Sequence, residues 1–230
     1  SPIIQVGFKD AYDNITKTET TTTINLSSNS GNGVFYDSLD SDAISSINIP
    51  ANSSIFSLYY SDISSGLWTM TVASENISSG TQNIAVSSSD PVRVALRGQD
   101  GATEQVTLIK GANYNLAATL YDIYGNIASA TKRLNFTYET DSSTATLSRT
   151  SGQFSLGQNA TSSTYRDTLS GEHIAKIIVP GIGQDSMDIK YIEGDPVRLS
   201  FTPESANLRA GQVFSTKLII YNENNLPISL

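Results

Sequence analysis

Hydrophobic and polar residues alternate in short runs along most of this chain, and turn-forming residues separate the runs. In residues 134–138, for example, Leu134, Phe136 and Tyr138 alternate with polar residues. Alternation of this kind places every second side chain on the same face of an extended strand, so that one face can be buried. No stretch has a convincing helical period. The pattern therefore predicts an all-β protein.

The stretch from residue 90 to residue 194 contains seven or eight predicted strands. One strand opens it near Val92 and Ala95, and a turn of the type Asp-Ile-Tyr-Gly-Asn follows the next. The later predicted strands are residues 114–121, 134–138, 144–147, 154–156, 162–166, 173–179 and 187–191. So many short strands in about 105 residues are typical of an immunoglobulin-like (Ig-like) β-sandwich.

Sequence motifs recur along the chain in the same order. Residues 90–93 and residues 195–198 both read Asp-Pro-Val-Arg, at a spacing of 105. Residues 60–66 match residues 165–171 at the same spacing, through a shared Tyr, Asp and Gly. Because two separate matches share one spacing, they indicate a tandem repeat rather than a bias in composition.

A third match has a different spacing and locates an insertion. Residues 10–15 match residues 122–127 at a spacing of 112, so the first unit has seven extra residues between positions 15 and 62. Residues 221–229 run beside residues 121–129 at a spacing of 100. The last stretch of the chain therefore starts a third unit.

The repeats predict three parts of the chain. Residues 1–89 form an Ig-like domain without its first strand, residues 90–194 a complete Ig-like domain, and residues 195–230 the opening strands of a third. Two strands alone are marginal in water, and an open sheet edge invites another strand. Two interpretations of residues 195–230 stay open. They are part of a segment taken from a longer array, or they supply the missing strand of a neighbouring copy.

The repeated motifs resemble those of bacterial tandem Ig-like repeats of cell-surface proteins. The resemblance lies in Asp-Pro-Val at the start of a unit, Tyr-Asp-x-x-Gly-Asn after the second strand, and Asp-x-x-x-Gly before a late strand. Such repeats build adhesins, surface layers and long secreted proteins. The resemblance implies an extracellular structural or adhesive protein, and it carries over no catalytic residue.

Composition argues against one class of partner and excludes several structural features. The net charge is −8, and only 16% of the residues are charged. Nucleic acid is therefore not expected as the main partner, because phosphate binding needs clustered Lys and Arg. The chain has no Cys, which excludes disulfides and thiolate metal sites. No apolar run is long enough for a helix that spans a membrane.

Catalysis has little support in the sequence. His173 is the sole histidine, and it occupies the place that Trp68 has in the first unit, so packing is the better interpretation of both. Residues 152–157 miss the spacing of a nucleophile elbow by one position. We therefore expect no enzymatic activity and no organic cofactor.

Calcium is the metal for which the sequence offers ligands, because calcium binds carboxylate and amide oxygens. Asp90 at the junction and Asp122 and Asn126 in the loop after the second strand would lie at one end of a sandwich. Asp195 takes the place of Asp90 in the third unit, but Asn222 replaces Asp122 there. Turn formation by Asp and Asn side chains is the competing interpretation.

Two functions of different classes stay open. The first is a non-enzymatic extracellular array, such as a surface layer, stalk or fibre, whose partners are other copies of itself in head-to-tail order. The second is an adhesin or a carbohydrate-binding module of a larger secreted protein, whose partners are host or surface glycans. Aromatic residues in loops, here Tyr12 and Tyr124, would serve the second function.

Overall fold

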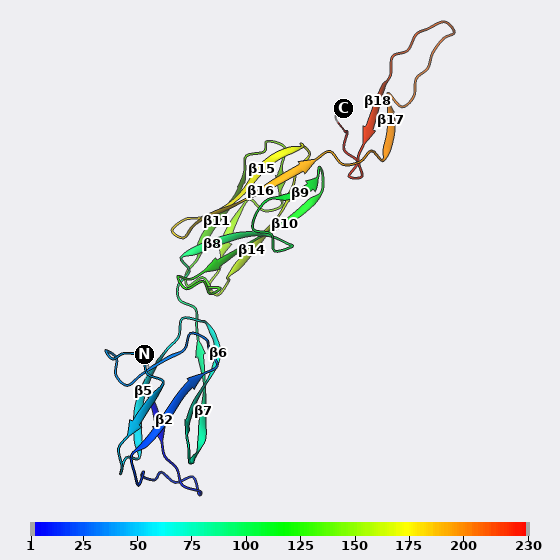
Figure 1. Cartoon of the computed structure of the whole chain (residues 1–230). Coiled ribbons are helices and arrows are strands. Elements are labelled where there is room, and N and C mark those ends of the chain that lie inside the picture. The colour runs from blue at the N-terminus through cyan, green and yellow to red at the C-terminus, as the bar shows by residue number, and fades with distance from the viewer. Residues whose placement is uncertain (1–2, 229–230) are drawn as a thin grey trace. The chain divides into compact units, whose positions relative to one another are not determined.

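A computed structural model describes residues 3–228, and every regular element in this range is a β-strand (Figure 1). The all-β fold class expected from the alternating pattern is confirmed. The chain divides into two compact units, Ser1–Ser88 and Ser89–Leu230. No helix that could span a membrane occurs within the described range.

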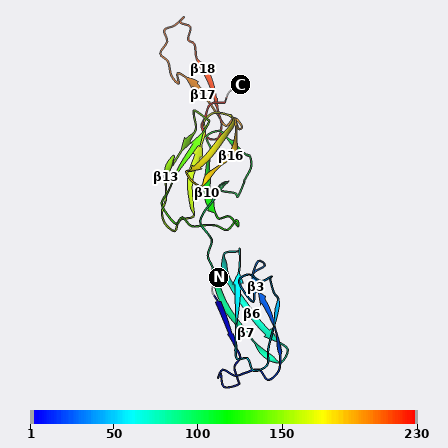
Figure 2. The ribbon, with the colours of Figure 1, turned by 90° about the vertical axis from the view of Figure 1, so that its left-hand side faces the viewer.

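The first unit is a sandwich of two antiparallel sheets. One sheet consists, in spatial order, of β1 (Ile3–Gly7), β5 (Ile55–Ser61) and β3 (Val34–Tyr36). The other consists of β4 (Ser46–Ile49), β2 (Thr22–Ser28), β6 (Gly66–Ser74) and β7 (Ile77–Val86). Figure 2 labels β3, β6 and β7 in a view turned by 90°. The buried core between the sheets includes Phe35, Leu58, Tyr60 and Met70.

The second unit has the same plan with two additional strands. One sheet consists of β12 (Thr146–Leu147), β14 (Ala160–Arg166), β10 (Asn113–Tyr121) and β8 (Arg93–Gly98). The other consists of β13 (Ser151–Phe154), β11 (Leu134–Thr140), β15 (Gly171–Val179), β16 (Gly183–Ile192) and β9 (Val106–Ile109). Strand β9 runs parallel to β16, and the other pairs are antiparallel. The core includes Leu116, Phe136, Tyr165 and Tyr191.

The second unit ends in a separate two-stranded antiparallel sheet. It consists of β17 (Arg198–Thr202) and β18 (Lys217–Tyr221), in which Arg198 lies opposite Tyr221. Arg93 of β8 lies opposite Tyr121 of β10 in the same way. Strands β17 and β18 are therefore the counterparts of β8 and β10. Figure 1 shows the long loop between them extending away from their sheet.

Strands of the first unit correspond one to one with strands of the second. Trp68 lies opposite Ile84 between β6 and β7, and His173 lies opposite Ile189 between β15 and β16. The spacing of 105 therefore holds in the structure. The seven extra residues fall between β3 and β4, where the first unit has a longer loop than the second has between β12 and β13. Strands β8 and β9 have no counterpart among residues 3–88.

One predicted strand is shifted in the structure, and one observed strand was not predicted. The strand predicted at residues 154–156 is observed as Ser151–Phe154, because this segment pairs with β11 while Gly157, at φ 81°, belongs to the turn that follows. The parallel edge strand β9 was not predicted, since its four residues have a burial pattern without a clear alternation.

Candidate functional site

The loop after β10 is a turn that Asp122 organises. Its Oδ1 accepts hydrogen bonds from the backbone N–H groups of Tyr124 and Asn126, both at 2.9 Å. Gly125, at φ 87°, donates its N–H to the carbonyl of Asp122 at 3.2 Å. A short polar side chain followed by a residue that tolerates the left-handed region is therefore enough to close this loop.

The same turn occurs three times among residues 3–228. Asp10 and Asn222 hold the position of Asp122, and the Oδ1 atom of each accepts the two corresponding N–H groups, at 2.9 and 3.0 Å respectively. Asp13 and Asn225 take the left-handed position of Gly125, at φ 69° and 59°. Asp and Asn adopt this region more readily than other residues with a Cβ atom, so the turn survives these replacements.

Of the four predicted calcium ligands, the structure brings Asp122 and Asn126 together. The Nδ2 of Asn126 donates to Oδ2 of Asp122 at 2.9 Å. Asp90 and Asp195 are exposed. Among residues 3–228, no group of three or more His, Asp and Glu side chains could hold a metal ion. Amide and carbonyl oxygens also bind calcium, and calcium at this loop stays a prediction.

Asp122 also braces the entry to the second unit. Its Oδ2 accepts the backbone N–H of Ser89 at 3.1 Å. Burial raises the pKa of this carboxyl, but the hydrogen bonds from Asn126, Ser89 and Tyr124 outweigh burial, and the pKa lies below its ordinary value. Neighbouring N–H groups of its own unit therefore stabilise the negative charge of Asp122.

Asn222, at the end of the second sandwich, donates hydrogen bonds where Asp122 accepts them. Its buried Nδ2 donates to the carbonyl of Glu193 at 2.9 Å and to the carbonyl of Lys110 at 3.2 Å. The Lys110 ammonium forms an ion pair with the Glu193 carboxylate. The amide at position 222 thus supplies a hydrogen-bond donor to two carbonyl groups at this end of the sandwich. The replacement of Asp by Asn, which the sequence alone presents only as a weaker calcium site, has this structural reason.

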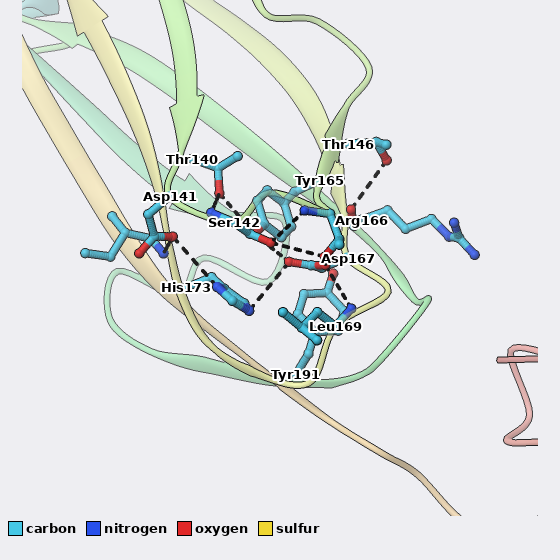
Figure 3. Close-up of polar contacts among 12 residues, drawn as sticks. Thr140, Asp141, Ser142, Thr146, Tyr165, Arg166, Asp167, Leu169, His173 and Tyr191 are labelled. Atoms are coloured by element: carbon cyan, nitrogen blue, oxygen red, sulfur yellow. Dashed lines mark hydrogen bonds and ion pairs between the residues drawn. The ribbon is translucent and has the colours of Figure 1, made fainter. Parts of the chain in front are cut away.

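A second polar cluster surrounds the buried carboxylate of Asp167 (Figure 3). Its Oδ1 accepts the backbone N–H of Leu169 at 2.9 Å and the hydroxyl of Thr144 at 2.5 Å. Its Oδ2 accepts the hydroxyl of Tyr165 at 3.4 Å. In the first unit Asp62 is held in the same way, because it accepts the hydroxyl of Tyr60 at 2.7 Å and the N–H of Ser64 at 2.8 Å.

Hydrogen bonding decides the charge of Asp167. Burial raises the pKa of this carboxyl, but hydrogen bonds from Ser142, Thr144 and Leu169 and the nearby His173 outweigh burial. The pKa therefore lies below its ordinary value. In contrast, burial raises the pKa of the Tyr165 phenol to about 12. A charged Asp167 and a neutral Tyr165 hydroxyl form a structural pair at neutral pH.

His173 lies at the rim of this cluster. Its Nε2 is 3.7 Å from Oδ2 of Asp167, and its Nδ1 is 3.9 Å from Oδ1 of Asp141. The Nε2 atom is buried without a hydrogen-bond partner. Trp68, at the equivalent position, donates its indole N–H to the carbonyl of Ser64 at 2.8 Å. Nε2 of His173 thus faces the Asp167 carboxylate at a distance longer than a hydrogen bond.

An apolar groove lies along the first unit between β1 and β7. A cavity of about 180 Å³ is lined by residues of β1, β3, β5, β6 and β7, among them Ile4, Val6, Leu58 and Met70. A second cavity of about 670 Å³ shares Val6 and several neighbours with the first, so the two form one groove, called here the β1 groove. Sequence reasoning predicted a missing strand but not this groove, because the groove depends on residues from five separate strands.

In the second unit the corresponding space is filled. Strand β8 pairs with β10, the counterpart of β1, and also contacts β16, the counterpart of β7. Val94 and Leu96 of β8 point into the core and are each 2% exposed. The backbone N–H of Leu96 additionally donates to Oδ2 of Asp185 at 2.8 Å. The β1 groove is therefore the place of an opening strand.

No protein-family model matches the sequence, and no curated protein matches it. The chain is similar to Ig-like surface proteins of bacteria. Invasin, a bacterial integrin-binding protein, aligns with 99% of this chain and 44% of its own length, at 16% identity and a TM-score of 0.39. The S-layer protein SbsC aligns with 97% of this chain and 26% of its own, at 19% identity and a TM-score of 0.36.

A glycosyl hydrolase family 2 member from Bacteroides cellulosilyticus is also similar. It aligns with 75% of this chain and 24% of its own length, at 13% identity and a TM-score of 0.39. The chain thus spans less than half of the length of each of these three proteins. Integrin binding, layer formation and glycoside hydrolysis belong to those proteins, and the fold described above rests on the strands of this chain.

Proposed function

We propose that the chain is part of a non-enzymatic, extracellular array in which Ig-like sandwiches follow one another in series, as in a surface layer, stalk or fibre. The observation that carries the proposal is the junction at Asn222. There the third copy of the repeated turn binds the end of the preceding sandwich through two backbone carbonyls. An array that keeps its shape needs such junctions, because a linker without contacts behaves as a flexible coil.

Packing at the same junction supports this function. The side chain of Leu226 lies so close to Gly111 that a Cβ atom added there would be 2.5 Å from it. The side chain of Asn224 also donates to the carbonyl of Lys110, at 3.2 Å. The turn at residues 222–226 therefore combines buried hydrogen bonds with close apolar contact, which orders the start of β17 and β18 relative to the sandwich before them.

The surface chemistry agrees with an extracellular location. The chain has 22 acidic and 14 basic residues, and it contains no Cys that a change of redox state could affect. A polar surface with a net charge away from zero keeps a protein soluble without partners.

Location on the cell surface is the direct test of the proposed function. Antibodies raised against the purified chain should label intact cells of the organism that makes it, and protease added to intact cells should remove the label. A cytoplasmic control protein should resist the same protease. Label that appears only after cell lysis would contradict the proposal.

Calcium at the turns is proposed as a stabiliser of the array. Asp122 and Asn126 would contribute oxygen atoms together with Asp90 at the start of the second unit, and Asp195 would contribute at the start of the third. The measurement is the thermal unfolding midpoint in calcium and in a chelator. A rise in calcium that is absent in an Asp122→Asn variant supports the site, and equal midpoints for the native chain contradict it.

A second candidate function is glycan binding, either as an adhesin or as a carbohydrate-binding module. The observation that favours it is that Tyr12 and Tyr124 hold the same position in two copies of the turn and are 87% and 59% exposed. An amphipathic ring at an exposed loop suits contact with a sugar. Binding on a glycan array that disappears in the double variant Tyr12→Ala and Tyr124→Ala would support this function, whereas an array without any bound glycan would exclude it.

A further inference from the structure

We propose that the outer face of the sheet formed by β12, β14, β10 and β8 binds a linear acidic polysaccharide. This surface of the second unit, called here the arginine face, presents Arg93, Arg97 and Arg166. The inference goes beyond the proposed array, because it names a partner of a different chemistry. It combines the placement of the three arginines, the lack of acidic residues in the four strands and the polar side chains around the arginines.

All three arginines point away from the core of the second unit. Strand β8 buries Val94 and Leu96 in that core. Because successive residues of a strand face opposite sides, Arg93 and Arg97 lie on the outer face of the sheet. Arg166 of β14 follows a buried tyrosine and lies on the same outer face. Two strands on either side of β10 thus contribute positive charge to one surface.

The arginines form an evenly spaced stripe along β10. Each lies opposite one of three β10 residues that are four positions apart, in the order Arg166 with Asn113, Arg97 with Ala117 and Arg93 with Tyr121. Four residues of a strand span about 13 Å. Charges at such regular steps along a flat sheet suit a linear polymer with repeated negative charges. A small anion, in contrast, would find no enclosing pocket there.

Contacts within the unit orient two of the guanidinium groups without neutralising them. Arg166 donates its Nε–H to the carbonyl of Gly111 at 2.8 Å, and Figure 3 shows its side chain pointing away from Asp167. The guanidinium carbon of Arg93 lies 4.5 Å from the centre of the Tyr121 ring. None of the three arginines is in a salt bridge among residues 3–228. Their charge is therefore available to an anionic partner.

The four strands of the arginine face contain no Asp or Glu. On the other sheet of the same unit the charges are mixed, since Glu139 lies opposite Lys176, and Glu172 forms an ion pair with Lys190 at 3.1 Å. Asp185 approaches β8 from that sheet, but its Oδ2 accepts a backbone N–H of β8 at 2.8 Å. The arginine face is thus a positive surface on a chain with a net charge of −8, and an acidic partner complements it.

The side chains around the arginines suit the hydroxyl groups of a sugar. They carry hydroxyls and amides, and they include Asn113, Asn115, Thr119, Ser162 and Thr164. The hydroxyl of Thr164 donates to Oδ1 of Asn115 at 2.7 Å. Hydroxyl and amide groups both donate and accept hydrogen bonds, as sugar hydroxyls do. Charge from the arginines and hydrogen bonds from these residues together favour an acidic polysaccharide.

The repeat preserves one element of this face. Arg198 of β17 lies opposite Tyr221 of β18, as Arg93 lies opposite Tyr121. Its guanidinium carbon lies 3.9 Å from the centre of the tyrosine ring. Two successive copies of the repeat therefore present the same stacked pair, which suits a long polymer better than a single small ligand.

Binding of defined polymers tests the proposal. In isothermal titration calorimetry at low ionic strength, the purified chain should bind polygalacturonate, which carries carboxylates, or dextran sulfate, which carries sulfates. Added salt should weaken the binding, because it screens exposed charges. Uncharged dextran is the control for the sugar backbone and should bind far more weakly. A chain that binds neither acidic polymer, or that binds dextran equally well, would overturn the proposal.

Paired variants locate the binding surface. The double variant Arg93→Gln and Arg97→Gln should weaken binding by at least about tenfold, since it removes charge-assisted hydrogen bonds. The matched control is Lys176→Gln with Lys190→Gln, which changes the net charge equally on the other sheet and should bind like the native chain. Equal losses in the two double variants would show attraction to net charge alone and would refute the arginine face.

An added carboxylate tests the same surface with every arginine in place. Thr119→Glu introduces a negative charge on β10 between the rows of Arg97 and Arg93, and binding should fall. Thr137→Glu, on the outer face of β11 in the other sheet, is the control and should bind like the native chain. The thermal unfolding midpoint of each variant shows whether the sandwich is intact. An intact Thr119→Glu variant with native affinity would contradict the proposed site.

Other results would assign the observations to a different partner or site. Residues 1–88 contain eight acidic and two basic residues, so the first unit of a second copy is the competing occupant. A chain that binds neither polymer but self-associates in sedimentation, with the association lost in the double arginine variant, would favour that occupant and exclude the polysaccharide. Polymer binding that is lost only in the double variant Tyr12→Ala and Tyr124→Ala would place the site in the loops and refute the arginine face.

The failure of this inference can be distinguished from the failure of the proposed function, because binding in solution does not depend on where the chain lies in the cell. A chain that labels the cell surface but binds neither polymer would refute the polysaccharide and leave the array intact. A chain that binds through its arginines but lies inside the cell would refute the proposed function alone.

Discussion

At the scale of single residues, Asp122 and Asn222 form the same turn. The side-chain atom that faces out of the turn accepts a hydrogen bond in Asp122 and donates hydrogen bonds in Asn222. The outward oxygen of Asp122 accepts an N–H group, whereas the outward nitrogen of Asn222 donates to two carbonyl groups. Asp and Asn differ little in shape, so the hydrogen-bond polarity of the surroundings selects between them.

Replacement of Asn222 by Asp should therefore loosen the junction. A carboxylate would face the carbonyls of Lys110 and Glu193 without a proton to donate, and we expect a loss of about 1–3 kcal/mol. Hydrogen exchange of residues 217–228 measures the effect. Asn207→Asp, an identical change at an exposed position of the loop between β17 and β18, is the control and should leave exchange unaltered. Equal protection in the two variants would contradict the assigned role of Asn222.

The charge of Asp167 predicts a dependence of stability on pH. Because its pKa is lower in the folded chain than its ordinary value of about 3.9, the folded state binds fewer protons than the unfolded state near that pH. Its contribution is present in full above the ordinary value and is lost as the pH falls through the lower, folded value.

Denaturant unfolding of the second unit between pH 7 and pH 2 measures this contribution. We expect the free energy of unfolding to decrease as the pH drops below about 4. An Asp167→Asn variant should be less stable at neutral pH, and its stability should depend less steeply on pH in this acid range. Asp188→Asn, at an exposed position of β16, serves as the control and should keep the native slope. A variant at position 167 with an unchanged slope would contradict the role of this carboxylate.

At the scale of elements, strands and turns recur while loops differ. The loop between β3 and β4 contains the extra residues of the first unit, but the second unit connects β12 and β13 with a short turn. Most of residues 37–43 are exposed. Exposed loops with few contacts tolerate changes in length.

Deletion of residues 37–43 should consequently leave the first unit folded. The remaining connection would have two residues, close to the three residues that connect β12 and β13. We expect the free energy of unfolding to change by less than about 1 kcal/mol, because loop closure depends only weakly on loop length. Circular dichroism with denaturant titration is the measurement. Loss of the cooperative transition would mean that this loop supports the sandwich.

At the scale of the whole molecule, each of the two units has its own core. The core of the first unit includes Leu58, and the core of the second includes Leu116, both without exposed surface. Separate cores are a property of domains that fold as units. A substitution that destabilises one core should therefore lower the stability of that unit alone.

The variant Leu58→Ala should destabilise the first unit by about 2–5 kcal/mol, the usual cost of truncating a buried leucine. Hydrogen exchange followed by mass spectrometry reports on each unit separately. Protection should fall in residues 3–86 and stay constant in residues 113–192, and Leu116→Ala should give the reverse pattern. A fall in both units from either variant would indicate a single cooperative fold.

The sequence by itself determined the strands, the all-β class and the spacings of the repeat. The alternation of Leu134, Phe136 and Tyr138 is local, and so is the turn that Asp122 forms with the next four residues. Local patterns are readable without a structure, because strand period and turn geometry depend on residues that are near in sequence.

The tertiary structure alone decided the β1 groove, the cluster around Asp167 and the polarity of position 222. Asn222 meets Lys110 across 112 positions, and the groove combines residues from five strands. In each case the deciding contact joins residues that are distant in sequence. Whether a position needs a donor, an acceptor or an apolar side chain depends on what those distant partners present, and no local pattern records it.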